Sequence, residues 1–202
     1  MAIGDVEGKG PEAAALTGLV RHTLRAETLH DGNPAHLMRM LNRVVYLDDT
    51  DRFCTVALAA IEPRAAGVRL RVACGGHLPP IVTRRDGPPS EIGCRGTLLG
   101  VEPDVRVVAE ELDLDEGDGL VLYTDGVLDA GAPDATLTSR NLVDLLAEAG
   151  GESPQETAGR LHDAAVAGAA APRDDIAILA MRVTAPDHAR DVAPAAPATG
   201  LP

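Results

Sequence analysis

Three acidic residues share one local setting, in which an extended apolar run meets a carboxylate. Asp5 closes the apolar stub at the start of the chain, Asp125 follows the run 120–123, and Asp174 precedes the run 176–181. A strand end holds a carboxylate rigidly, and the glycines beside Asp5 and Asp125 leave space next to it. If the three ends meet at one edge of a sheet, they form an all-oxygen site of the kind that Mg²⁺ or Mn²⁺ prefers.

A competing interpretation is that each aspartate is a turn or capping residue, which is the usual role of aspartate beside glycine. Asp86, Asp115 and Asp118 fit it well, since each lies in a glycine-containing hairpin turn. Carboxylates at strand ends far apart in the chain weaken it, but spacing alone leaves both interpretations open. No His or Cys accompanies the three aspartates, which counts against zinc.

Two further polar residues have the same ambiguity. His77 stands in the segment GGHLPP and could orient a substrate, although its Gly-Gly and Pro-Pro neighbours favour a turn residue. Lys9 could attract a phosphate beside a helix N-terminus, although a solvated loop lysine fits as well.

Helices are expected on either side of a block of strands. Pro11 opens a helix over 11–29, and Asn33 caps a second over 34–47, with an inward face listed as Leu37, Met40, Leu41, Val44 and Val45. Two more helices are expected at 139–148 and 154–167.

Strands are expected at 53–61, 68–74, 81–83, 105–112, 120–123 and 176–183. The strands 105–112 and 120–123 should pair around the turn 115–119. Because strands and helices segregate along the chain, the pattern indicates an α+β fold rather than alternating βαβ units.

Composition narrows the classes of partner and compartment. The net charge of −13 argues against nucleic acid binding, and no basic cluster is present. No signal peptide and no apolar run of about 20 residues is visible, so we expect a cytoplasmic protein with no membrane segment. The three cysteines, Cys54, Cys74 and Cys94, are expected to be free, buried thiols in a reducing compartment.

Five short segments stand in one order along the chain: residues 3–10 (IGDVEGKG), 75–80 (GGHLPP), 98–101 (LLGV), 122–127 (LYTDGV) and 173–176 (RDDI). Together they resemble the corresponding segments of SpoIIE/RsbU-type serine/threonine phosphatases, a branch of the PPM or protein phosphatase 2C-like superfamily. No single segment is specific, but five in the family's order are.

The resemblance implies a four-layer α-β-β-α sandwich of two mainly antiparallel sheets flanked by helices, with two Mg²⁺ or Mn²⁺ ions at one end. Asp5 would bridge both ions and the backbone carbonyl of Val6 would bind one of them. Asp125 and Asp174 would hold the other ion, so Asp5, Asp125 and Asp174 are the expected catalytic residues. A metal-activated water would then hydrolyse phosphoserine or phosphothreonine directly.

Family members carry a further Gly-Asp segment on strands that precede the first one here. We therefore expect residues 1–184 to form a phosphatase domain that is incomplete at its N-terminus, with its first strands absent and one ion position depleted. Residues 185–202, rich in Ala and Pro, are expected to be a disordered tail.

The expected function is metal-dependent phosphoprotein phosphatase activity in bacterial signalling. By resemblance, the substrate would be a phosphorylated anti-sigma-factor antagonist or another small signalling protein. The alternative is a catalytically degenerate module of the same fold that binds and regulates a signalling partner.

Overall fold

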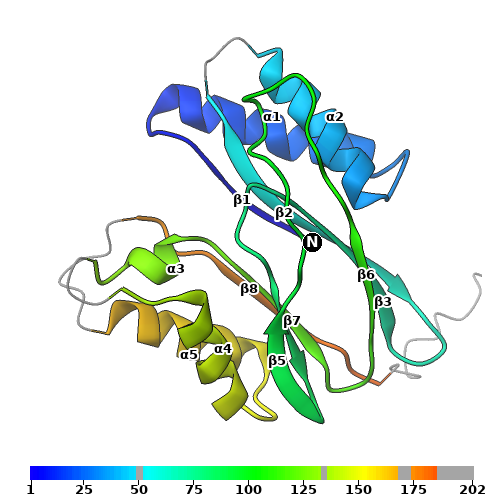
Figure 1. Ribbon diagram of the computed structural model, residues 1–202, viewed down its shortest axis with the longest axis vertical. Coiled ribbons are helices and arrows are strands. Elements are labelled where there is room, and N and C mark those ends of the chain that lie inside the picture. Colours follow the sequence, from blue (N-terminus) through cyan, green and yellow to red (C-terminus); the bar gives the residue numbers. More distant parts are fainter. Residues whose placement is uncertain (49–51, 133–135, 168–173, 186–202) are drawn as a thin grey trace, which may run out of the picture.

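The computed structural model of the chain describes residues 1–48, 52–132, 136–167 and 174–185 (Figure 1). The strands in these ranges are β1 (Ala2–Val6), β2 (Cys54–Pro63), β3 (Val68–Gly75), β4 (Ile81–Arg84), β5 (Gly87–Glu91), β6 (Glu110–Leu114), β7 (Gly119–Tyr123) and β8 (Ile178–Arg182). The helices are α1 (Pro11–Glu27), α2 (Pro34–Tyr46), α3 (Gly126–Asp129), α4 (Ser139–Glu148) and α5 (Pro154–Val166). None of these helices is long and apolar enough to cross a membrane.

The strands form two four-stranded antiparallel sheets, with the orders β1-β2-β3-β6 and β5-β4-β7-β8. Strand β7 shows the layering, because successive side chains of a strand point to opposite faces. Leu120 and Leu122 pack into the core between the sheets, whereas Val121 and Tyr123 pack against α4 and α5. On the other sheet, α1 and α2 cover the outer face. The α-β-β-α sandwich and the α+β class are therefore confirmed.

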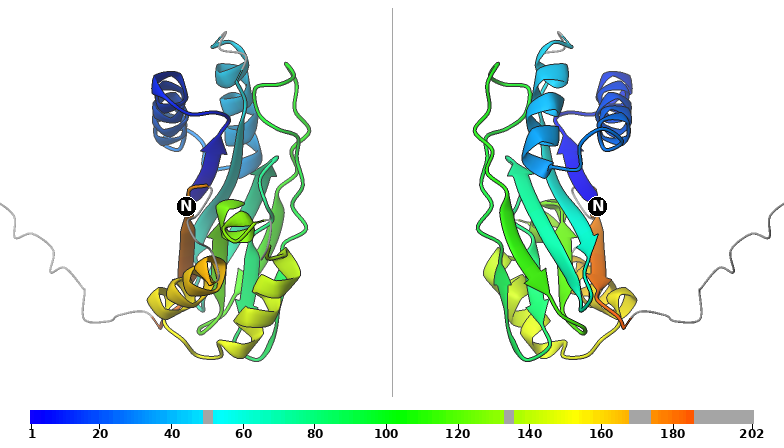
Figure 2. Two further views of the ribbon diagram at one scale, coloured as in Figure 1. Left: turned by 90° about the vertical axis from the view of Figure 1, so that its left-hand side faces the viewer. Right: turned by 90° about the vertical axis from the view of Figure 1, so that its right-hand side faces the viewer.

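The edge strands of the two sheets lie on the same side of the molecule. Strand β1 ends the first sheet and β8 ends the second. Figure 2 shows them next to each other, with the N-terminus between them. This arrangement brings β1 and β8, the first and last strands of the chain that the structure describes, to one side of the molecule.

One strand pairing was predicted wrongly. Strand β6 pairs with β3, whereas β7 lies between β4 and β8 in the other sheet, so the turn between β6 and β7 crosses from one sheet to the other. Leu114 of β6 and Leu120 of β7 meet in the inter-sheet core. The predicted strand 105–112 overlaps β6 only at residues 110–112. The pairing was missed because a turn that joins two layers has the same local sequence as a hairpin turn.

The buried face of α2 also differs from the prediction. Met38 and Asn42 are buried, whereas Met40 and Val44 are only half-buried. The reason is a contact with a distant loop: the Asn42 amide donates to the carbonyls of Glu102 and Pro103 at 3.0 and 3.2 Å. The helix is rotated so that this polar group faces the loop.

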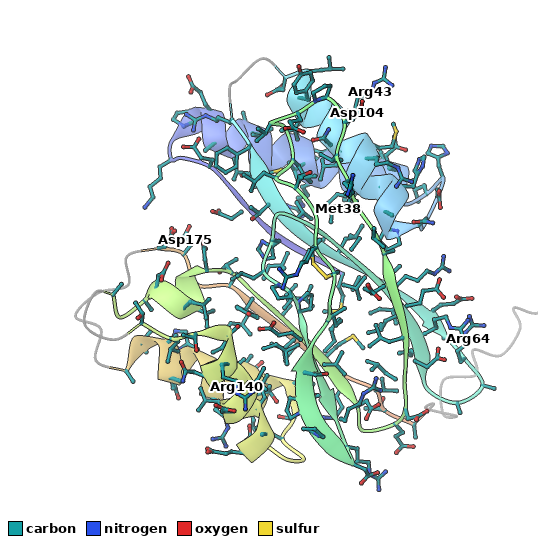
Figure 3. All side chains as sticks on the ribbon, viewed as in Figure 1. Met38, Arg43, Arg64, Asp104, Arg140 and Asp175 are labelled. Atoms are coloured by element: carbon teal, nitrogen blue, oxygen red, sulfur yellow. A yellow bond between two sulfur atoms is a disulfide. The ribbon has the colours of Figure 1, made fainter. Side chains whose placement is uncertain are left out.

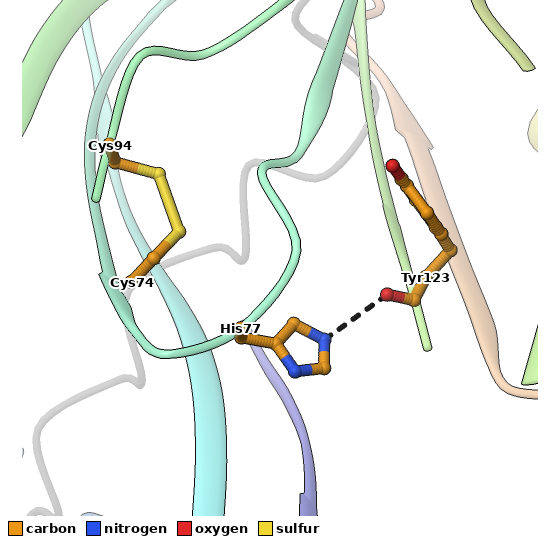
Figure 4. Close-up of a disulfide and its surroundings, with 4 residues drawn as sticks. All are labelled: Cys74, His77, Cys94 and Tyr123. Carbon is orange, nitrogen blue, oxygen red and sulfur yellow. Dashed lines mark hydrogen bonds between the residues drawn. A yellow bond between two sulfur atoms is a disulfide. The ribbon is translucent and has the colours of Figure 1, made fainter. Parts of the chain in front are cut away.

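The expectation of three free cysteines was wrong for two of them. Cys74 of β3 and Cys94, which follows β5, form a disulfide in the inter-sheet core, with their Cα atoms 5.7 Å apart (Figure 4). Cys54 is free and buried. The pairing requires two segments separated by 20 residues to meet, and the spacing of cysteines in the sequence does not reveal such a meeting.

Candidate functional site

The predicted carboxylates lie at the ends of the neighbouring edge strands and of β7. Asp5 is on β1, directly opposite Thr55 of β2. Asp125 follows β7 and caps α3, where its Oδ1 accepts a hydrogen bond from the Gly126 amide at 3.0 Å. Asp174 precedes β8, which pairs with β7. The structure therefore brings the three strand ends to one end of the sandwich.

The alternation of β1 places the Asp5 carboxylate on the face that looks toward the second sheet. Ile3, two residues earlier, is buried in the inter-sheet core, and residues two apart on a strand share a face. Thr55 has the same orientation, because Ala57 lies in that core. Asp5 and Thr55 thus face the strand ends that carry Asp125 and Asp174.

The electrostatics of Asp5 show that these carboxylates lie within reach of one another. Partial burial raises the pKa of Asp5, and the backbone amide of Val6 lowers it by hydrogen bonding. The negative charges of Asp125, Asp174 and Asp175 raise the pKa of Asp5 further, for a net increase. Like charges gathered without a cation disfavour ionisation, which is the condition that a bound divalent ion relieves.

Thr124 joins the end of β7 to the segment that leads into β8. Its hydroxyl donates to the Asp175 carbonyl at 3.1 Å and accepts from the Ala177 amide at 3.0 Å, while its own amide donates to the Ala177 carbonyl at 3.1 Å. Thr124 is buried. These bonds hold Asp125 beside the pair Asp174 and Asp175.

Gly126 permits this close approach. A Cβ atom added to Gly126 would overlap the carbonyl oxygen of Asp175. Figure 3 shows Asp175 beside α3 at the start of β8. A residue with a side chain at 126 would push the two segments apart, so the glycine next to Asp125 serves packing of backbone against backbone.

His77 connects the two sheets at the same end. Its Nδ1 lies 2.9 Å from the Thr55 hydroxyl. Its Nε2 lies 3.1 Å from the Tyr123 carbonyl oxygen, the contact drawn in Figure 4. The sequence favoured a turn residue here, and His77 does stand in the turn between β3 and β4. The sequence did not show that its ring reaches both sheets.

A groove of about 580 Å³ opens beside the carboxylates. Asp5, Thr55 and Asp175 line one part of it, and Arg21 and Arg25 of α1 line another. Asp175 is therefore as close to the candidate site as Asp174. Strand β8 begins at Ile178 and both aspartates precede it, so the alternation of side chains along that strand does not separate them.

The donor chemistry of this region fits a hard divalent cation. The candidate ligands are the carboxylates of Asp5, Asp125 and Asp174 and the carbonyl of Val6, all oxygen donors, which suits Mg²⁺ or Mn²⁺. Among the described residues, no three or more His, Cys, Asp or Glu side chains are gathered tightly enough to hold an ion. The charges of the other carboxylates therefore act on Asp5, but the described side chains do not form a complete coordination shell.

Known structures identify the fold. The SiaA-PP2C domain of Pseudomonas aeruginosa superposes with a TM-score of 0.76 at 21% identity, covering 90% of this chain and 73% of that one. The RsbU and RsbW domains of Rv1364c from Mycobacterium tuberculosis give a TM-score of 0.73 at 23% identity, over 92% of this chain and 51% of that one. The fold is therefore that of the PPM, or PP2C-type, phosphatases.

The family follows from the sequence itself. Residues 1–184 match the family described as Stage II sporulation protein E (SpoIIE), and the chain belongs to that family. The phosphoserine phosphatase RsbU of Bacillus subtilis (strain 168) is 27% identical over 165 residues, which cover 81% of this chain. The chain spans only about half of RsbU, 49% of its length.

Proposed function

We propose that the chain is a metal-dependent protein serine/threonine phosphatase that hydrolyses phosphoserine or phosphothreonine. The observation that carries the proposal is the gathering of Asp5, Asp125 and Asp174 at one end of the two sheets, with the charges of Asp125 and Asp174 acting on Asp5. Similarity to a phosphoserine phosphatase supports the same reaction. Such a cluster suits phosphate hydrolysis, because the divalent ions that it would hold neutralise the charge of the phosphoryl oxygens.

Each residue has a proposed role at this site. Asp5 would bridge two Mg²⁺ or Mn²⁺ ions, with the Val6 carbonyl on one of them and Asp125 and Asp174 on the other. The ions, when bound, would supply positive charge for the phosphoryl oxygens and lower the pKa of water. Thr124 and Gly126 hold together the segments that carry the proposed ligands. Thr124 forms a hydrogen bond to the segment before β8, and Gly126, which has no side chain, leaves room for that segment.

The proposed substrate is a phosphorylated protein, of the anti-sigma-factor antagonist type, in bacterial signalling. The proposed catalytic domain is residues 1–184, which the SpoIIE match spans, and residues 185–202 are proposed to be a tail outside it. An exposed groove beside the carboxylates suits a segment of polypeptide better than a small enclosed ligand.

The test is Mn²⁺-dependent hydrolysis of p-nitrophenyl phosphate and of a phosphoserine peptide, with Mn²⁺ affinity measured by calorimetry. Asp125→Asn and Asp174→Asn should each weaken Mn²⁺ binding by more than about 10-fold, a loss that even an outer partner of a metal ligand can cause. Asp86→Asn is the matched control, because Asp86 is an exposed turn residue.

Two results would contradict the proposal. Unchanged Mn²⁺ affinity in both ligand variants would remove the metal assignment. Metal binding without hydrolysis of either substrate would favour the alternative, a binding module of the same fold that regulates a partner.

A further inference from the structure

The ring of His77 makes one hydrogen bond to each sheet. Thr55, its partner on the first sheet, belongs to β2, and Tyr123, its partner on the second, is the last residue of β7. Thr55 lies opposite Asp5, and Tyr123 precedes Asp125 by two residues. The ring therefore connects β2, the neighbour of the strand that carries Asp5, to β7, the strand that precedes Asp125.

The two hydrogen-bond partners of the His77 ring define its protonation state. A carbonyl oxygen only accepts hydrogen bonds, so Nε2 must carry the proton that is donated to Tyr123. Nδ1 of the neutral ring then accepts from the hydroxyl of Thr55. Burial lowers the pKa of His77, and although the Tyr123 bond and the Asp125 charge raise it, the net change is downward. The geometry and the charge state agree on a neutral ring with its proton on Nε2.

The turn that carries His77 is itself held firmly. The disulfide joins Cys74, at the end of β3, to Cys94. The Gly76 amide donates to the Gly96 carbonyl at 3.2 Å, and Gly76 has a φ of 67°, in the left-handed region that favours glycine. Because this turn is held in place, the His77 ring can fix the positions of Thr55 and Tyr123. On a free loop, the ring would move with these two residues instead.

We infer that His77 is a positioning residue, which sets the separation between Asp5 on β1 and Asp125 after β7 by bridging Thr55 and Tyr123. This inference rests on the proposed function, because the separation matters for holding ions between the two carboxylates. Loss of a direct partner of a ligand typically weakens metal binding by about 10–100-fold, and we expect the lower end of that range here because His77 acts through Thr55 and Tyr123.

The simpler interpretation is that His77 only stabilises its turn. It predicts that replacing the ring lowers stability and leaves ion binding unchanged in the protein that remains folded. Asn42 is a matched control for this effect. It is another buried polar side chain that anchors a loop by accepting from the Gly100 amide at 2.8 Å and donating to Glu102 and Pro103.

The experiment uses the full chain with His77→Ala, Asn42→Ala and the pair Thr55→Val and Thr55→Ser. Thermal unfolding without metal measures stability, and calorimetry with Mn²⁺ alone measures affinity. We expect both alanine variants to unfold at lower temperature, but only His77→Ala to lose about 10-fold or more in Mn²⁺ affinity. Thr55→Val should lose affinity as well, and Thr55→Ser, which keeps the hydroxyl, should restore it.

Nitrogen-15 NMR of the imidazole supplies a readout that is independent of metal. In the unaltered chain we expect a protonated Nε2 and an unprotonated Nδ1, with the Nδ1 signal shifted in Thr55→Val. In His77→Ala the backbone amides of both Asp5 and Asp125 should change their chemical shifts together. If only one of them changes, or neither, His77 does not couple the two strands.

The outcomes separate this inference from the proposed function. Absence of Mn²⁺ binding in the unaltered chain would defeat the proposed function, and the NMR comparison would still decide whether His77 couples Asp5 to Asp125. Mn²⁺ binding that His77→Ala leaves intact, with a fall in unfolding temperature like that of Asn42→Ala, would overturn the positioning role alone.

Discussion

The Thr55 hydroxyl lies 2.9 Å from Nδ1 of His77, and this contact joins β2 to the turn between β3 and β4. The same imidazole ring bonds Tyr123 of the second sheet through Nε2. The two residues are 22 positions apart in the chain. Their contact occurs at the end of the sandwich where Asp5 and Asp125 stand. The two hydrogen bonds that link Thr55, His77 and Tyr123 therefore lie beside the proposed metal site.

The partly buried, neutral ring of His77 makes stability depend on pH. The unfolded chain binds the proton near pH 6.5, and the folded chain binds it only at a lower pH because its pKa is lowered, first by burial. As pH falls below about 6.5, protonation thus favours the unfolded state, by at most about 1.4 kcal/mol per pH unit. Urea unfolding at pH 7.5 and 5.5 should show this loss. It should be smaller in His77→Gln and unchanged in His22→Gln, since His22 is exposed; an equal loss in all three proteins would refute the assignment.

Thiol counting tests the disulfide. Alkylation of the denatured protein without reductant should label only Cys54, and after reduction it should label three cysteines. Because the disulfide closes a loop of 20 residues, its removal should lower the free energy of unfolding by about 3 kcal/mol. Labelling of all three cysteines before reduction would show that the thiols are free.

Gly126→Ala should separate the segments that carry the proposed ligands Asp125 and Asp174, because the new methyl group would overlap the carbonyl of Asp175. We expect Mn²⁺ affinity to fall by about 10-fold or more, as for other disturbed supports of metal ligands. Gly159→Ala is the control: no atom lies within 4 Å of the added methyl group in α5, so stability should rise by about 0.5–1 kcal/mol. Calorimetry and thermal unfolding measure the two effects. Normal affinity in Gly126→Ala would mean that the close contact is not needed.

Asp118 is a buried carboxylate that organises the turn between β6 and β7. It accepts from Arg84 at 2.6 Å, from the Arg85 amide at 2.9 Å and from the Asp115 amide at 3.2 Å. Burial alone would raise the pKa of Asp118, but these bonds outweigh it and the pKa is lowered. The stabilisation is therefore present above pH 3.8, the ordinary value, and is lost as pH falls through the lower folded value.

Asp118→Ala should reduce the free energy of unfolding at pH 7 by about 2–3 kcal/mol, because three donors lose a charged acceptor. Chemical unfolding measures the change. The exposed pair of Arg69 and Asp113 provides the comparison, since Asp113→Ala should have a much smaller effect. If both variants lose the same free energy of unfolding, the buried contacts of Asp118 stabilise the fold no more than the exposed ion pair does.

Residues 186–202 lie outside the described part of the chain, and the sequence predicts that they are dispensable. They alternate Ala and Pro with few bulky apolar groups to bury. A chain that ends at residue 185 should keep its melting temperature within about 2 °C. A larger fall, measured by differential scanning calorimetry, would show that the segment docks on the domain.

Local sequence determined most of the elements. Pro11 and Asn33 mark helix starts that the structure has at the same places, and the Asn33 side chain accepts from the amides of Ala35 and His36. The alternating pattern at 68–74 and the continuous apolar run at 120–123 predicted strands that are present as β3 and β7. Such signals are legible because capping and alternation act between residues a few positions apart.

The candidate carboxylates were also visible in the sequence, but their neighbours were not. Asp5, Asp125 and Asp174 stood out by their place at strand ends, and the gathering of those ends supports the proposal. Asp175, Thr124 and the two hydrogen bonds of the His77 ring entered only with the structure, because these contacts cross from one strand or sheet to another.

Tertiary structure alone decided the partner of β6, the Cys74–Cys94 disulfide and the rotation of α2 around Asn42. Each depends on segments that are distant in sequence and are brought together by burying apolar surface. Hydrophobic burial has no directional preference, so an apolar strand pattern specifies that a face is covered without specifying by which strand. The choice among possible partners is made by the packing of the whole domain.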